Sequence, residues 1–193
     1  AGLLPETAAA LASNRSGALR RMLLEGLRAT DARIAADEPV SPAFLFALLL
    51  WPAYCRTLAM LQAQGMHVAE AERRAADRVT LHQVATVALP RRFSLPMQEV
   101  WLLQARFSQR QRKRVVRLLS HPRFRAAYDF LLLRQSASDS HAEDIAFWAE
   151  AQRDPDHALE VAALTVESEG DGASTESRGP RRRRRRRPAA AGH

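Results

Sequence analysis

Apolar residues recur at helical spacing through the first half of the chain. In residues 17–36, Leu23 and Leu27 lie one helical turn apart on the same side, which predicts an amphipathic helix. Ser41 followed by Pro42 is typical of a helix start, because serine caps the first turn and proline fits its first position. The pattern therefore predicts two successive helices here.

The second of these helices is expected to run to about Gln64. It should be bent or broken at Pro52, because proline lacks the N–H group that a helical hydrogen bond needs. A third, more polar helix is expected over residues 68–88, ended by Pro90. The residues of this helix that should point inward are Val79, Val84 and Val87.

The helical pattern continues through the second half of the chain. Ser94 is expected to cap a helix that runs through Phe107, and His121 with Pro122 to begin another. Further helices are expected over residues 109–119, from a capping box at residues 140–143, and over residues 156–166. Strand-like alternation is missing. The predicted fold class is therefore all-α, an irregular body of about seven helices followed by a disordered Arg-rich tail.

Composition and charge divide the chain into three predicted units. Residues 1–88 are expected to form a helical body, and residues 89–165 a basic helical domain. Residues 166–193 are expected to form a linker and a tail. From Glu167 to the arginine run, Glu, Ser, Gly and Asp make a linker that buries too little apolar surface to order itself. The tail contains seven consecutive arginines, Arg181 to Arg187.

Basic residues are concentrated in residues 89–134, which hold eleven Lys or Arg residues against the two carboxylates Glu99 and Asp129. An acidic stretch follows over residues 135–166, where Arg153 stands against seven acids. Five basic residues recur at spacings of three and four and are expected to form one helical stripe, namely Arg106, Arg110, Lys113, Arg114 and Arg117. Apolar residues of the same segment should face the other way, namely Val115, Leu118 and Leu119.

A basic helical surface backed by its own core is typical of a protein that binds a polyanion. Because residues 106–117 contain six basic residues and no acid, their repulsion is relieved when nucleic acid covers them. The candidate RNA-binding residues are Arg91, Arg92, Arg106, Arg110, Arg112, Lys113, Arg114, Arg117, Arg123 and Arg125, together with Arg181, Arg182, Arg183, Arg184, Arg185, Arg186 and Arg187. The alternatives are a solvated, partly ion-paired face and a low-complexity tail without a dedicated role. Phe93 and Tyr128 are minor candidates for base stacking.

No set of residues indicates an active site within this chain. Asp154 and Asp156 have the spacing of a two-metal site but lack a third acid nearby, so a loop between helices is the favoured interpretation. His121 is expected to cap a helix, and Cys55 to be a core thiol. We therefore expect no catalytic residue, metal ligand or bound cofactor here.

The single cysteine, Cys55, excludes an intramolecular disulfide and fits a reducing cytoplasm. The most apolar run, residues 43–54, is too short to span a bilayer and contains Pro52, so we expect a buried helix and no membrane span. The chain starts at Ala1 without a methionine, which favours a piece of a longer protein.

Several segments resemble a known family. They are Leu89-Pro90-Arg91-Arg92-Phe93, Glu99-Val100-Trp101, Gln109 to Arg114, and above all His121-Pro122-Arg123-Phe124-Arg125-Ala126-Ala127-Tyr128-Asp129. These residues are similar to the C-terminal body and arginine-rich tail of the bacterial poly(A) polymerase I family, within the class II nucleotidyltransferases. Upstream segments at residues 30–34 and 40–47 resemble the helical body of the same enzymes. The segment from His121 to Asp129 separates this group from the related CCA-adding enzymes.

The resemblance implies a parent enzyme that uses ATP and Mg²⁺ to add adenylates to RNA 3′ ends in mRNA processing and decay. In that family the nucleotide loop and catalytic carboxylates lie in an N-terminal head, and no residue here matches them. The implied role of this chain is to hold RNA and to meet proteins of RNA decay, without activity of its own. A free-standing helical RNA-binding module and a protein-interaction scaffold remain the alternatives.

Overall fold

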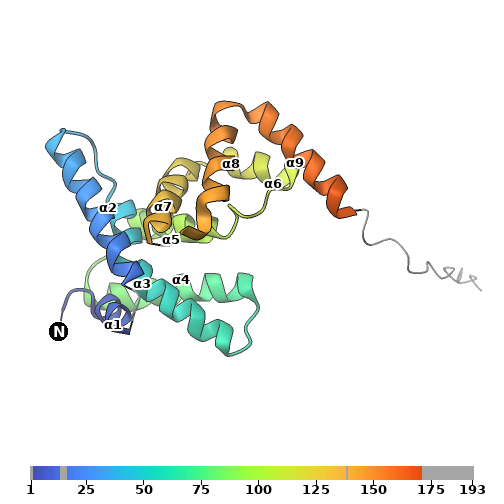
Figure 1. The fold of residues 1–193 in the computed structure, drawn as a ribbon. Helices are drawn as coiled ribbons and strands as arrows, with labels where there is room; N and C mark the ends of the chain where they lie inside the picture. The colour runs from blue at the N-terminus through green and yellow to red at the C-terminus, as the bar shows by residue number, and fades with distance from the viewer. Residues whose placement is uncertain (1, 14–16, 138, 171–193) are drawn as a thin grey trace, which may run out of the picture.

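The computed structural model describes residues 2–13, 17–137 and 139–170, which form α-helices, one 3₁₀ turn and connecting loops, with no strand among them (Figure 1). The all-α fold class predicted from the sequence is confirmed. Within these residues there are nine α-helices rather than about seven, in part because a first helix forms over Pro5–Ser13. This segment is rich in alanine, which favours helix strongly but leaves no apolar periodicity to detect.

The helices follow one another through short loops. The first half contains α1 (Pro5–Ser13), α2 (Ala18–Ala35), α3 (Pro42–Ala63), α4 (Val68–Thr86) and α5 (Arg91–Gln104). The second half contains α6 (Arg112–Leu119), α7 (Phe124–Ala137), the 3₁₀ turn Asp139–His141, α8 (Ala142–Arg153) and α9 (Pro155–Gly170). Figure 1 shows α2 at one end of the molecule and α6, α8 and α9 at the other.

Helix α3 is the central helix of the first half and packs against α1, α4 and α5. It begins as predicted, because the Ser41 Oγ accepts from the backbone N–H of Phe44 at 3.4 Å and Pro42 holds the first position. The expected break at Pro52 is wrong, since the helix continues to Ala63 with Pro52 fully buried. By length and composition alone α3 is apolar enough to cross a membrane, but nine of its residues are buried in this fold, as in a core helix.

Two local predictions are corrected by the structure. Helix α5 begins at Arg91 rather than at a Ser94 cap, because the backbone N–H groups of Phe93 and Ser94 already donate to the Pro90 carbonyl. Val84 is exposed rather than inward, and Gln83 is buried beside it through a hydrogen bond to the Leu3 carbonyl at 3.0 Å. Gln83 is thus buried in place of Val84 because a backbone acceptor lies opposite its side chain.

Two further boundaries differ from the sequence pattern. Helix α8 has His141 at its N-cap with no side-chain cap, so the predicted capping box does not form. Glu143 of that box points into solvent with 93% of its side chain exposed. Helix α9 continues to Gly170, past the predicted end near residue 166. The predicted disordered tail and Arg181–Arg187 lie outside the described residues.

The first hydrophobic core is built around Trp101 of α5. Its indole N–H donates to the Ala47 carbonyl of α3 at 3.0 Å, and its ring stacks on Tyr54 with centroids 4.9 Å apart. The buried residues that surround this pair come mainly from α2, α3, α4 and α5, among them Met22, Leu48, Leu50, Val79, Met97 and Val100. Trp101 therefore ties α5 to the central helix.

The second hydrophobic core is built in the same way around Trp148 of α8. Its indole N–H donates to the Phe107 carbonyl at 2.7 Å, and the two rings meet edge to face at 5.5 Å. The other large residues of this core are Leu103, Val115, Leu118, Phe124, Tyr128 and Leu131. The loop after α5 and the short helix α6 are thus held by α8 across a long sequence separation.

The two cores meet at α5 and α7, each of which contributes residues to both. At this junction the Gln104 amide donates to the carbonyls of Val100 and Ala127, both at 3.0 Å, and accepts from Arg134 at 3.2 Å. The Arg134 guanidinium also lies 5.3 Å over the Trp51 ring. Because these polar groups satisfy one another, they fix α5 against α7. The predicted domain boundary after residue 88 stays a prediction.

Candidate nucleic-acid interface

Helix α6 is short, and its two faces differ sharply. Val115 and Leu118 are buried in the second core, with Leu119 partly buried beside them, as predicted. The remaining side of the helix carries the exposed cations Arg112, Lys113, Arg114 and Arg117. Because eight residues make a marginal helix in isolation, the packing of Val115 and Leu118 is what holds these charges in place.

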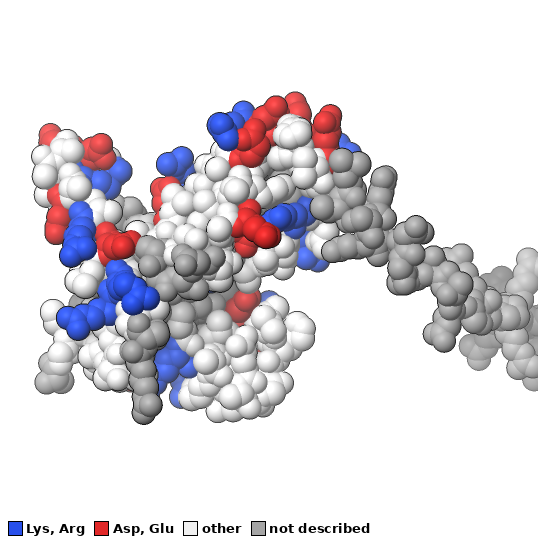
Figure 2. All heavy atoms as spheres, in the orientation of Figure 1, with Lys and Arg blue, Asp and Glu red and all other residues white. Residues whose placement is uncertain are grey.

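None of these four cations has an ion-pair partner among the described side chains, but Arg112 lines a hollow together with Asp156 and Glu160. Lys113, Arg114 and Arg117 lie more than 4.0 Å from every carboxylate whose side chain the structure describes. Acidic side chains gather instead over the part of the surface where Figure 1 places α8 and α9 (Figure 2). We refer to Lys113, Arg114 and Arg117 as the free cations of α6.

Arg110 does not belong to the helical stripe that the sequence predicts. It lies in the loop before α6, where its Nη2 is 3.0 Å from the Asp144 Oδ1 and 3.9 Å from a Glu143 oxygen. Its guanidinium also lies 5.3 Å over the Phe147 ring. The expectation of one continuous stripe is therefore wrong, because α6 begins only at Arg112 and Arg110 is drawn toward α8.

Two other predicted residues are also ion-paired. The Arg123 Nε is 3.1 Å from the Glu99 Oε2 of α5, and the Arg125 Nε is 3.1 Å from Asp129 one turn later in α7. The first pair joins the start of α7 to α5, and the second lies within one helix. Both are exposed, so solvent screens them and each contributes little to stability.

The remaining predicted residues are spread over the surface. Arg91 and Arg92 lie at the start of α5, where the Arg92 guanidinium stands 4.9 Å over the Phe93 ring. Arg106 lies in the turn after α5, and its charge offsets the effect of burial, which raises the pKa of Glu72. The structure thus does not gather the predicted residues into one patch. Arg181–Arg187 lie outside the described residues.

Residues with possible catalytic chemistry have structural roles. The Asp154 Oδ1 accepts from the backbone N–H of His157 at 3.0 Å and so caps the first turn of α9. His121 Nδ1 accepts from the backbone N–H of Arg123 at 3.1 Å, which confirms its predicted capping role. Burial raises the pKa of the Cys55 thiol to about 12, as expected for a core cysteine. The described residues contain no group of three or more potential metal ligands.

Most aromatic residues of the basic segment lie in the hydrophobic cores. Trp101, Phe107, Phe124 and Tyr128 are all buried, and the Tyr128 hydroxyl donates to the Ile145 carbonyl at 3.3 Å. Tyr128 therefore offers no ring face for base stacking. Phe93 is only partly buried, and Arg92 covers its ring.

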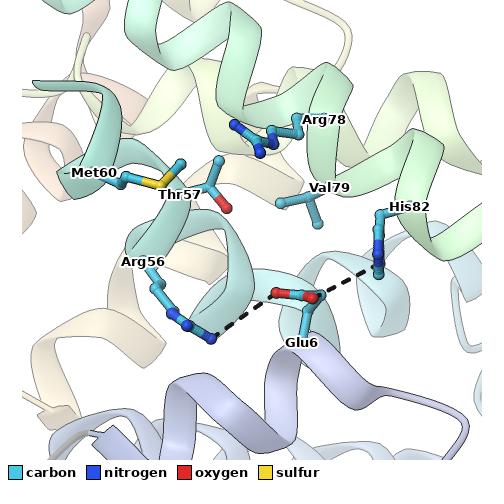
Figure 3. Close-up of a pocket in the computed structure, with 7 residues that line it drawn as sticks. All are labelled: Glu6, Arg56, Thr57, Met60, Arg78, Val79 and His82. Carbon is cyan, nitrogen blue, oxygen red and sulfur yellow. Dashed lines mark ion pairs between the residues drawn. The ribbon is translucent and has the colours of Figure 1, made fainter. Parts of the chain in front are cut away.

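A second charged region is a cleft of about 490 Å³ lined by residues of α1, α3 and α4 (Figure 3). The Glu6 carboxylate points between Arg56 and His82, with its oxygens 3.9 Å from the Arg56 Nη1 and from the His82 Nδ1. Arg78 completes the charged lining. Glu6 thus offsets part of the positive charge at this cleft, whereas no described carboxylate pairs with the free cations of α6.

A family model described as the arginine-rich C-terminus of polymerase A matches residues 64–189. The chain belongs to this family. Over 153 residues it is 35% identical to poly(A) polymerase I of Salmonella typhi. These residues are 78% of this chain and 33% of that protein. The corresponding protein of Escherichia coli O6:H1 is 37% identical over 133 residues, covering 68% of this chain and 29% of that protein.

Poly(A) polymerase I of Haemophilus influenzae is 28% identical over 147 residues, or 76% of this chain and 32% of that protein. The chain therefore spans about a third of the length of the curated relatives it matches. The part matched by the arginine-rich polymerase family includes α6 and its free cations as well as Arg181–Arg187. The resemblance stated from the sequence is confirmed.

Proposed function

We propose that this chain is the RNA-holding part of a bacterial poly(A) polymerase, and that the free cations of α6 contact the phosphates of a single RNA strand near its 3′ end. The observation that carries the proposal is an uncompensated cationic helix face fixed by a buried core. A rigid cation array holds phosphates at defined positions, which a flexible arginine run does not do. Arg181–Arg187 would add affinity that depends on salt and not on base sequence.

The parent enzyme, in this proposal, adds adenylates from ATP to RNA 3′ ends. The family membership supports a role related to poly(A) polymerase, and the relatives carry that name. We assign the ATP and Mg²⁺ chemistry to parts of the parent protein other than this chain. We further infer that the parent works in the cytoplasm, on RNAs destined for decay, alongside proteins of the decay machinery.

The experiment replaces the three free cations together. In a chain ending at Gly170, K113Q/R114Q/R117Q removes three positive charges while glutamine keeps helix propensity. We expect the affinity for a single-stranded RNA of about 12 nucleotides to fall at least tenfold, which is about 1.4 kcal/mol. Helical circular dichroism and the melting temperature should stay close to those of the parent chain, because these exposed side chains make no ion pair with a described carboxylate.

A charge-matched control separates position from net charge. R20Q/R28Q/R73Q also removes three exposed arginines, two of them on α2 at the far end of the molecule from α6 (Figure 1). We expect this variant to lose less than threefold in affinity. If both triple variants weaken RNA binding equally, only the total charge matters and the proposed interface on α6 is wrong.

A further inference from the structure

Beside the free cations lies an apolar cleft of about 610 Å³ between α6 and the α8–α9 corner. Helices α6 and α9 pack against each other, and Figure 1 shows them side by side. The residues of this cleft that matter here are Val116, Leu119, Phe124, Leu159, Arg125 and Gln152. The lining of the cleft is thus mainly apolar, with polar groups supplied by Arg125 and Gln152.

We propose that this cleft binds one unpaired nucleobase of the RNA strand whose phosphates lie on α6. The inference rests on the proposed function, and it adds a base-binding site to a phosphate-binding face. It also changes what the interface does, since a strand held by a base as well as by phosphates has a fixed register on the protein.

The positions on α6 place the two sites next to each other. Lys113 and Arg117 lie one turn apart, about 6 Å along the helix axis, on the outer side of the helix. Val116 and Ser120 form the neighbouring row, also one turn apart, and both line the cleft. A strand that lies along the cations therefore passes the mouth of the cleft and can turn one base into it.

Charge favours a nucleic acid over an apolar peptide as the occupant. Arg125 lines the cleft, and Lys113 and Arg117 lie on α6 next to Val116, which is also part of the lining. A nucleotide satisfies both features because its base is flat and apolar on its faces, while its phosphate is negative. At the far end, Arg112 shares a hollow with Asp156 and Glu160, whose carboxylates would repel phosphate. The strand should therefore leave toward Arg125.

Val116 supplies an exposed apolar wall that the core does not use. Its side chain is 45% exposed, although Val115 and Leu118 beside it are buried. The floor includes Phe124, whose ring is fixed by stacking on Tyr128 at 6.2 Å. A base that covers Val116 and packs on this floor removes apolar surface from water, which is favourable.

Gln152 supplies a hydrogen-bond acceptor at the cleft. Its Nε2 donates to the Trp148 carbonyl at 2.9 Å, and because a carbonyl only accepts, the orientation of the amide is fixed. Its Oε1 is then left without a partner among the residues that the structure describes. This oxygen can accept from an exocyclic amino group, such as that of adenine.

The test measures base-dependent affinity with the full 193-residue chain. The probes are an oligoadenylate of about 12 nucleotides and a strand of equal length and charge that lacks bases at its central positions. The two probes carry the same number of phosphates. Any contribution of Arg181–Arg187 to phosphate binding therefore cancels from the ratio of affinities. We expect the oligoadenylate to bind at least threefold more tightly. Equal affinity for the two probes would overturn the proposal.

Two variants and one matched control locate the effect. Val116→Ser removes the apolar wall and Gln152→Leu removes the acceptor, and each should bring the ratio of affinities close to one. Val84→Ser is the same change at an equally exposed valine of α4, 47% exposed, and should leave the ratio unchanged. A ratio that survives both cleft variants would mean that the base binds elsewhere, and the proposal would fail.

A spectroscopic measurement keeps the test decisive if a cleft variant unfolds. The side-chain amide resonances of Gln152 in the unaltered chain should shift on addition of the oligoadenylate but not of the strand without central bases. An unshifted Gln152 amide at saturation would contradict the proposal. If the cleft does not bind a base but the proposed function is right, K113Q/R114Q/R117Q would still weaken binding of both probes. Failure of the base site is therefore distinguishable from failure of the proposed function.

Discussion

Arginines serve opposite purposes in the α6 face and in the contacts around it. Arg114 and Arg117 stand in solvent without a carboxylate partner among the described residues, whereas Arg110 and Arg123 bridge elements that lie far apart in sequence. Arg110 reaches Asp144, which is 34 residues away. The same type of side chain links two elements in one place and, in our proposal, is open to RNA phosphates in the other. Its neighbours in the fold decide between the two roles.

This difference shows why net charge is a poor guide to an interface. Residues 89–134 are strongly basic as a whole, yet several of their charges are already committed within the fold. A paired arginine that turned toward RNA would have to leave a carboxylate behind, whereas a free cation loses only water and counterions. The free cations should therefore dominate binding.

The largest expected effect comes from removing the core that holds α6. Trp148→Ala deletes a fully buried side chain together with its hydrogen bond to Phe107, which should lower the free energy of unfolding by about 3–5 kcal/mol. Urea denaturation followed by circular dichroism measures this loss. Leu132→Ala, a truncation at a side chain that is 41% exposed, is the control and should have a much smaller effect. Similar losses in the two variants would show that the second core does not support α6.

A smaller loss of stability is expected where Arg110, in the loop before α6, contacts Asp144 of α8. Arg110→Gln breaks the contact with Asp144 and should lower the free energy of unfolding by about 1 kcal/mol, since the pair is only partly screened by solvent. Binding of RNA should change less than threefold. Lys113→Gln is the complementary variant. It should lower the affinity for RNA more than it lowers the free energy of unfolding. If Arg110→Gln instead weakened RNA binding and Lys113→Gln instead lowered stability, the distinction between paired and free cations would be wrong.

The smallest effect is expected at Arg125. Its pair with Asp129 lies on one helix and is highly exposed, so Arg125→Gln should change the free energy of unfolding by less than about 0.5 kcal/mol. Thermal melting at low and at high salt should give the same small difference. A loss comparable to that of Arg110→Gln would mean that exposed pairs in this protein are stronger than solvent screening allows.

Patterns that depend on neighbours in sequence were predictable. The Ser41 cap, the buried pair Val115 and Leu118, and the capping by His121 all follow from residues within one or two turns. The helical fold class followed for the same reason. The family was found from short segments, of which the strongest, His121 to Asp129, contains buried residues of the second core.

Features that depend on tertiary partners were not predictable. The position of Arg110 follows from Asp144 and Phe147, and nothing nearby in the sequence signals either contact. The burial of Gln83 in place of Val84 follows from the Leu3 carbonyl, 80 residues away. The cleft beside α6 forms because α9 packs against that helix. No pattern in the sequence therefore identified its lining residues.

The most direct test of the central claim is the salt dependence of RNA affinity, because its slope counts the phosphates neutralised. For single strands each contact contributes roughly 0.7 to the slope of log affinity against log salt, so K113Q/R114Q/R117Q should reduce the slope by about 2. The charge-matched R74Q/R110Q/R123Q, which removes arginines paired with Glu70, Asp144 and Glu99, should leave the slope nearly unchanged in the chain ending at Gly170. Equal reductions in the two variants, or a reduction only in the second, would contradict the account.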